Sequence, residues 1–169
     1  MEVIYHYTSG SHLEKILESG KLIVSEWERK NKIKPPAFWF SKNPIWEATA
    51  TKMVVCPNGQ TKKLSKEEQH KEFGLYRFVI PFVKEKFCSW QKYKHKCNIS
   101  SPMCDHMEKE GIRQGARPGQ WFAVFENISL KDCLRCEVWD GVAWRLHTDF
   151  TSEIPLKKKM EIRQLSPEF

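Results

Sequence analysis

The sequence has no apolar run that approaches the roughly 20 residues a helix needs to span a bilayer. Its first residues, MEVIYHY, lack the basic and apolar blocks of a signal peptide. It also contains no internal repeat and no low-complexity segment. We therefore expect a cytoplasmic protein with no membrane partner, and in that reducing compartment we expect its six cysteines to be free thiols.

Zinc binding is the alternative use of these cysteines. Cys88, Cys97, Cys104 and His106 lie within one 19-residue stretch, and CLRC at 133–136 has the short spacing of a zinc knuckle. However, CLRC has no glycine to form the knuckle turn. The longer segment CLRCEVW predicts a strand, in which residues i and i+3 face opposite sides. We therefore favour free thiols and predict no metal site.

What the sequence does contain fits one basic domain. Its 169 residues are enough for a single domain over 1–169, and 40% apolar residues can fill a core. The formal charge of +7 favours an anionic partner, such as nucleic acid or a phosphorylated small molecule.

Short strands dominate the pattern, and about three helices accompany them, so we expect an α+β fold. The first helix is predicted by a capping box from Ser11 to Glu14, with Gly20 as its stop. Asn43 as N-cap and Pro44 predict a second helix, whose Glu47 should face solvent. A third should run from 101 to 111. The remaining segments are strands over 2–7, 37–41, 75–81 and 120–128, a hairpin around Asp140-Gly141, a polar surface excursion over 56–71, and an edge strand or loose tail over 155–169.

Two motifs suggest a site. The first, YHYTSGSHLEKILESG, places His6 between two tyrosines at the end of a strand, and the second, PAFWFSKNPIW, ends an aromatic strand in Ser41. Taken alone, His6 can be an ordinary half-buried histidine, and the aromatic residues at 38–40 and 46 can be plain core. In a strand, Phe38 and Phe40 share one face and Trp39 the other, so only one set can line a pocket.

The two motifs together resemble the ADP-ribosyltransferase superfamily. They are most similar to its DNA-targeting toxins and more distantly to RNA 2′-phosphotransferases, over about residues 3–52. The resemblance implies a small split β-sheet core of the ADP-ribosyltransferase type and NAD as substrate. It also implies a macromolecular acceptor, in a bacterial or phage conflict setting with an antitoxin or immunity protein as partner. The charge favours nucleic acid as that acceptor. An RNA 2′-phosphotransferase activity is the less favoured alternative, because the first motifs lack the several arginines that such an enzyme would need around a phosphate.

The resemblance also implies roles for individual residues. A histidine at the position of His6 orients the nicotinamide-side ribose, and an aromatic ring stacks on nicotinamide, which is favourable for a cationic ring. A site that breaks the nicotinamide–ribose bond must stabilise positive charge developing on the sugar. The cofactor-binding residues implied are Tyr7, Thr8, Ser9, Trp39, Phe40, Ser41, Trp46 and Arg117, with Lys42 and Arg145 as further candidates for the phosphates.

The family's catalytic glutamate has no clear counterpart. It usually begins a later strand, and here that strand is most naturally QWFAVFENI, whose first residue is Gln120. Gln120 is therefore the predicted positional equivalent, although an amide cannot act as a general base. Glu126 and Glu137 lie at other positions. The departure leaves a second hypothesis open, namely a catalytically inactive module that binds a nucleotide or nucleic acid.

The segment KEKFCSWQKYKHKC at 84–97 interleaves lysines with aromatic residues. It can be a solvated basic loop. Alternatively, it can be a nucleic-acid platform in which Lys92 and Lys94 contact phosphates and Trp90 or Tyr93 stacks on a base.

Overall fold

A seven-stranded sheet organises the computed structural model, which describes residues 1–24, 36–96, 99–148 and 150. The order of its strands is β11-β10-β6-β1-β3-β8-β7, and each pairing of neighbours is antiparallel. The strands of this sheet are β1 (Val3–Ser9), β3 (Phe38–Ser41), β6 (Leu75–Pro81), β7 (Cys88–Ser89), β8 (Trp121–Val124), β10 (Arg135–Trp139) and β11 (Trp144–Leu146). Two small two-stranded sheets pair β2 (Lys21–Leu22) with β9 (Ile128–Ser129) and β4 (Met53–Val55) with β5 (Thr61–Lys63).

The described residues contain four α-helices, so the predicted α+β class is confirmed with one helix more than expected. They are α1 (Gly10–Ser19), α3 (Lys66–Phe73), α4 (Trp90–Lys96) and α5 (Ser101–Arg113). Short 3-10 helices are η1 (Ala48–Ala50), η2 (Pro118–Gln120) and η3 (Leu130–Asp132). Within these residues, no helix combines the length and apolar character needed to cross a membrane.

Strand β1 lies at the centre of the sheet, but its two neighbours pair with it very differently. It pairs with β6 along its whole length, from Val3 opposite Pro81 to Ser9 opposite Leu75. With β3 it shares the single register pair Tyr5–Ser41. Beyond that pair the backbones of β1 and β3 are not joined in register, which leaves side chains of both strands free to line a cavity.

Three apolar clusters hold the fold together. The first includes Ile4 and Phe78 and is packed against α1 through Ile16 and Leu17. The second lies under α4 and α5 and includes Trp121. The third covers the opposite face of β1 through its two tyrosines. Because side chains alternate along a strand, β1 contributes Tyr5 and Tyr7 to one face and Ile4 and His6 to the other.

The first helix ends as predicted but begins differently. Gly20 adopts a left-handed conformation with φ of 66°, and its N–H donates to the carbonyls of Ile16 and Leu17. Helix α1 begins at Gly10 rather than after Ser11, and its N-cap Ser9 makes no side-chain capping bond. The predicted capping box is therefore wrong here, because the hydroxyls of Ser9 and Ser11 bond to each other at 2.8 Å.

The predicted second helix is also wrong. The chain after Asn43 forms a turn in which the Asn43 side-chain oxygen accepts the N–H of Ile45 at 2.9 Å. A side chain that can cap a helix can equally close a local turn. Helical structure follows only as the short η1.

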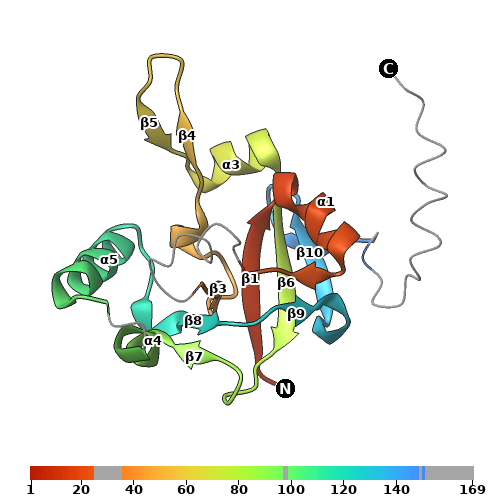
Figure 1. Cartoon of the computed structure of the whole chain (residues 1–169). Coiled ribbons are helices and arrows are strands. Elements are labelled where there is room, and N and C mark those ends of the chain that lie inside the picture. The colour runs from red at the N-terminus through yellow and green to blue at the C-terminus, as the bar shows by residue number, and fades with distance from the viewer. Residues whose placement is uncertain (25–35, 97–98, 149, 151–169) are drawn as a thin grey trace.

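The polar segment over 56–71 is more structured than predicted. It contributes to the hairpin of β4 and β5, which projects from the body of the molecule in Figure 1, and to most of α3. Helix α3 has a complete capping box between Ser65 and Glu68. The lysine-rich stretch over 84–97 likewise forms β7 and α4 rather than a loop.

Other predictions agree closely with the structure. Strand β6 spans 75–81 as predicted, and β10 and β11 form the hairpin around Asp140-Gly141. Helix α5 runs through Gly111 to Arg113 instead of ending at the glycine. The reason is tertiary: Gly111 packs against the ring of Trp121, so its missing side chain serves a contact and not a stop. The segment over 155–169 lies outside the described residues.

Candidate active site

A cleft of about 1230 Å³ opens where β1 and β3 diverge. Its walls come from β1, β3, α1, η1 and α5, and the hairpin of β4 and β5 contributes to its edge. Pockets for small ligands usually measure about 300–1,000 Å³. The volume is therefore sufficient for a dinucleotide-sized ligand.

His6 lies in this cleft with its ring held by the neighbouring strand. Its Nδ1 is 2.8 Å from the backbone carbonyl of Trp39, and its ring packs 4.0 Å from the ring centroid of Phe38. Because a carbonyl can only accept, Nδ1 carries the proton and Nε2 presents a lone pair. Burial, assisted by the positive charge of Lys52, lowers the pKa of His6 to about 4. The ring is therefore neutral at pH 7, and Nε2 is a hydrogen-bond acceptor.

A buried carboxylate lies in the same cleft. Glu47 is 6% exposed, and one of its oxygens accepts the Ser41 hydroxyl at 2.7 Å. The other accepts the Thr49 hydroxyl at 2.7 Å, the Thr49 N–H at 3.2 Å and the indole N–H of Trp121 at 3.2 Å. Among the described residues Glu47 has no ion-pair partner, so these donors alone offset the loss of hydration. The predicted solvent-facing Glu47 is thus wrong.

A buried carboxylate without a cationic partner is unusual in a protein interior. Such groups are retained more often at functional sites than elsewhere. Ser41 also accepts the N–H of Asn43 at 3.1 Å, so its hydroxyl hydrogen is directed at Glu47. The arrangement presents a fixed negative charge at the wall of the cleft.

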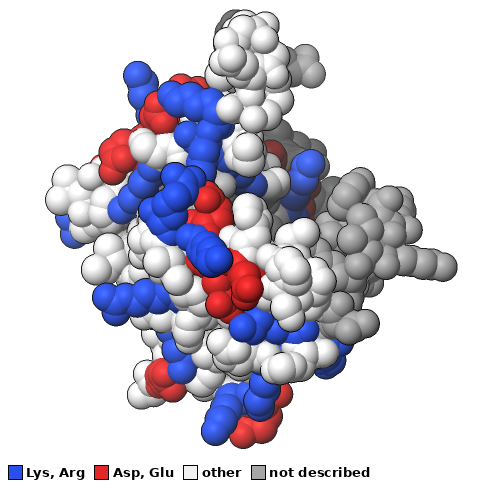
Figure 2. Space-filling view, turned by 90° about the vertical axis from the view of Figure 1, so that its left-hand side faces the viewer, with Lys and Arg blue, Asp and Glu red and all other residues white. Residues whose placement is uncertain are grey.

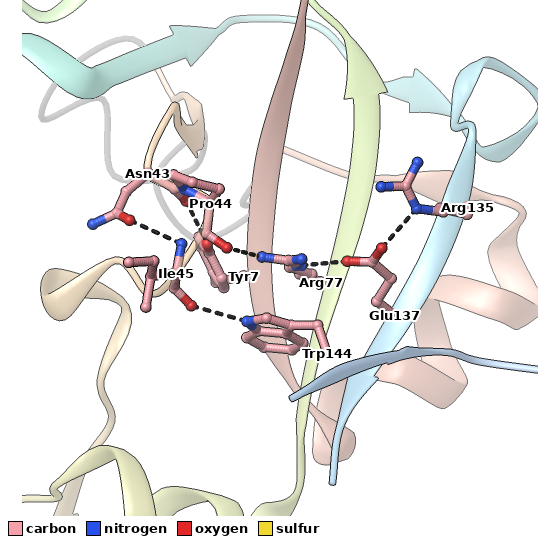
Figure 3. A network of polar contacts seen from close by, with 8 residues as sticks. All are labelled: Tyr7, Asn43, Pro44, Ile45, Arg77, Arg135, Glu137 and Trp144. Atoms are coloured by element: carbon pink, nitrogen blue, oxygen red, sulfur yellow. Dashed lines mark hydrogen bonds and ion pairs between the residues drawn. The ribbon is translucent and has the colours of Figure 1, made fainter. Parts of the chain in front are cut away.

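The other face of β1 carries a structural network, drawn in Figure 3. The Tyr7 hydroxyl donates to the carbonyl of Asn43 at 2.5 Å. Arg77 forms an ion pair with Glu137 at 2.5 Å and donates to the carbonyl of Pro44. The Arg77 guanidinium also lies 4.5 Å from the ring centroid of Trp144. This network ties the turn after β3 to β6 and β10, and so fixes the position from which Glu47 enters the cleft.

The structure brings together six of the predicted NAD-site residues and leaves four outside. His6, Tyr7, Thr8, Trp39, Phe40 and Ser41 line the cleft. Because Trp39 and Phe40 both line it, the prediction that only one face of their strand does so is wrong. Ser9, Trp46, Arg117 and Gln120 do not. The ring of Trp46 packs against Tyr7 with centroids 5.2 Å apart, which makes it part of the apolar cluster and not a free stacking surface. Arg117 is exposed in front of η2.

Gln120 does not line the cleft. It ends η2, and its side-chain oxygen is buried without a hydrogen-bond partner among the described residues. Glu47 occupies the cleft instead. Sequence reasoning missed it because its local context resembles the first turn of a helix. The one available signal was its position six residues after Ser41.

The predicted stacking of Trp90 or Tyr93 on a base is wrong for this structure, because both rings are buried. Trp90 and Tyr93 are each 1% exposed and belong to the cluster under α4 and α5. Neither ring is available to stack on a base in this structure. Lys94 is paired with Glu108 at 2.7 Å, whereas Lys92 is exposed.

Charge on this side of the molecule is mixed. Figure 2 views the side that carries α5 and shows acidic side chains lying between the Lys and Arg side chains. On this side, the basic side chains therefore do not form the continuous stripe of one sign that usually binds a nucleic-acid backbone.

The cysteines that the structure describes are free. Burial raises the pKa values of Cys133 and Cys136 to about 12, so these thiols are protonated and unreactive at neutral pH. Cys97 lies outside the described residues. Within the part of the chain that is described, no three His, Cys, Asp or Glu side chains group as metal ligands would.

Comparisons with known proteins add no relative: the chain matches no protein-family model, no curated protein and no solved structure.

Proposed function

We propose that this protein is an NAD-dependent ADP-ribosyltransferase that binds NAD in the cleft beside His6. The observation that carries the proposal is that two groups line one cleft: His6, whose Nε2 makes no hydrogen bond to a described residue, and Glu47, a buried carboxylate held by Ser41. A sugar hydroxyl needs an acceptor such as Nε2. A developing positive charge on that sugar needs a nearby negative charge.

The residues would divide the work as follows. His6 accepts a hydrogen bond from a ribose hydroxyl and orients the sugar. Trp39 packs against Tyr93 with centroids 4.6 Å apart but, unlike Trp46, lines the cleft, and we assign it to the nicotinamide ring. Glu47 takes the role that the sequence assigned to Gln120, so that its charge stabilises the ribose as the bond to nicotinamide breaks.

The reaction balances without a further reagent. The C1′–nitrogen bond breaks and nicotinamide leaves with its electron pair, while an acceptor O–H or N–H forms the new bond to C1′. Glu47 or water takes the proton that the acceptor loses. The net charge of +7 favours a nucleic-acid acceptor. A toxin-like role in bacterial or phage conflict follows from the resemblance of the two motifs.

The test is to incubate the full chain with NAD and with single- and double-stranded DNA and RNA. Free nicotinamide and an ADP-ribosyl mass adduct are then sought by mass spectrometry. His6→Ala should abolish both products. His95→Ala is the matched control, because His95 is an exposed histidine of α4 that does not line the cleft. Equal activity of the two variants would refute the role of His6.

A binding-only module is the second candidate, because Gln120 lies outside the cleft and Glu47 already accepts four hydrogen bonds. Calorimetric titration with NAD separates the two. Saturable binding without nicotinamide release, with every acceptor tried, would favour the module and overturn the transferase.

A further inference from the structure

A cluster of three basic side chains lies at the mouth of the cleft, close to His6. His12 and Lys15 come from α1, and Lys52 comes from the segment between η1 and β4; all three line the cleft. The Lys52 ammonium is 3.3 Å from Nδ1 of His12. Among the described residues, neither Lys15 nor Lys52 forms an ion pair with a carboxylate.

The backbone of Lys52 is fixed from both sides. Gln69 of α3 is 1% exposed, and its side-chain oxygen accepts the Lys52 N–H at 2.6 Å. The carbonyl of Lys52 accepts the N–H of Leu64 at 3.0 Å. The buried amide of Gln69 and the N–H of Leu64 therefore fix the backbone from which the Lys52 side chain reaches His12.

Protonation of His12 is disfavoured when the site is empty, and the neutral imidazole accepts a hydrogen bond from the Lys52 ammonium at 3.3 Å. Burial lowers the pKa of Lys52, and burial together with the charges of Lys52 and Lys15 lowers the pKa of His12. Among the described residues, the small pocket beside His12 is lined by Phe73 of α3 and by Met53 and Val54 of β4, with no carboxylate, and His6 on β1 is neutral. A bound anion would pair with the ammonium groups of Lys15 and Lys52 and would favour the protonated form of His12.

The rest of the cleft also carries more cationic side chains than carboxylates. Its only carboxylates among the described residues are Glu47 and Glu110, and both are engaged by donors of the protein. Its lysines and arginine include Lys21, Lys63 and Arg113 in addition to the cluster.

We propose that His12, Lys15 and Lys52 form a phosphate-binding site at the mouth of the cleft. Three convergent donors suit the oxygens of a phosphate group. The phosphate can belong to a nucleotide inside the cleft or to a nucleic-acid backbone that crosses its mouth. The site does not depend on the transferase reaction, because no bond need break for a phosphate to bind.

His12 makes the site sensitive to pH. An anion raises the pKa of the histidine it contacts, so binding draws a proton onto the imidazole. Affinity should therefore rise as the pH falls toward about 6. Replacing His12 by glutamine should remove this part of the pH dependence, whereas the titration of the phosphate itself is common to both proteins.

The experiment is calorimetry on the full chain with two probes, ADP and a short single-stranded DNA, at about pH 6 and about pH 8. Lys52→Gln and His12→Gln should each weaken binding about tenfold, the expected loss of one charge-assisted hydrogen bond. Lys62→Gln is the control, because it removes the same charge from an exposed lysine of β5 that is paired with Glu68.

Each outcome decides the matter. If Lys52→Gln weakens ADP binding but not DNA binding, a nucleotide supplies the phosphate; the opposite pattern assigns it to a nucleic-acid backbone. Binding unaffected by both cluster variants, weakened equally by Lys62→Gln, or absent for both probes would overturn the site. ADP binding through this cluster by a protein that releases no nicotinamide would keep the site and reject the transferase.

Discussion

Replacing Glu47 by glutamine separates the chemical role of the carboxylate from its structural one. Glutamine has nearly the same shape, and its amide oxygen can accept the donors of Thr49 and Trp121. Its NH₂ group would face Ser41, whose hydroxyl can turn to accept it. Only the negative charge and its ability to take a proton are lost.

Two substitutions of Glu47 should therefore behave differently. We expect Glu47→Gln to change the free energy of unfolding by less than about 1.5 kcal/mol, since each hydrogen bond keeps a partner. Glu47→Ala leaves the Ser41 hydroxyl and the Trp121 N–H without partners in the interior. At about 1–3 kcal/mol for each of these two orphaned groups, it should cost about 2–6 kcal/mol.

Urea denaturation measures both stabilities, and nicotinamide release measures activity. If Glu47 stabilises the ribose or takes the proton of the acceptor, Glu47→Gln should slow release about 10²–10⁴-fold in a protein that remains folded. Undiminished release by folded Glu47→Gln would refute the catalytic role. Equal destabilisation by both substitutions would refute the account of the hydrogen bonds.

Three further predictions concern stability. Gly111→Ala should destabilise the protein by about 1–2 kcal/mol in thermal unfolding, because its Cβ would lie 2.5 Å from the ring of Trp121 and overpacking exceeds the gain in helix propensity. Gly119→Ala is the control and should be neutral, since its Cβ would meet nothing within 4 Å. A stabilised Gly111→Ala protein would contradict this packing. Arg77→Ala should lower the free energy of unfolding in urea by about 3–5 kcal/mol, because the buried Glu137 would keep only the more exposed Arg135 as a partner. A loss below about 1 kcal/mol would show that the Arg77–Glu137 ion pair does not stabilise the fold. The pKa of His6 in the folded protein, about 4, lies below its ordinary 6.5, so the unfolded chain binds the proton first as the pH falls. Between about pH 7.5 and about pH 4.5, this difference should lower the free energy of unfolding by about 2–3 kcal/mol. The His6→Gln protein should lack this loss.

Local patterns predicted the elements whose structure is decided by near neighbours in the chain. The alternation and terminal proline of 75–81, the Asp140-Gly141 turn and the stop at Gly20 all depend on backbone preferences within a few residues. The motif around His6 likewise indicated a cleft residue, although His6 lies in the middle of β1 and not at the end of the strand as predicted.

The aromatic residues of the lysine-rich segment show where local reading fails. Trp90 and Tyr93 alternate with lysines, which suits either a solvated platform or one face of a helix. Their burial depends on contacts with Trp121 and Phe125 on a distant segment. No pattern within 84–97 records those contacts.

Sequence by itself determined the α+β class, the central strands and the placement of His6 and Ser41 within strands, because periodicity and turn chemistry act over short distances. Tertiary structure alone decided that Glu47 enters the cleft while Gln120 does not. Asn43 and Pro44 fit the start of a helix as well as they fit a turn, so local preference left the direction of Glu47 open. A donor 74 residues away, the indole N–H of Trp121, helps to make its burial tolerable, and only the folded chain brings the two together.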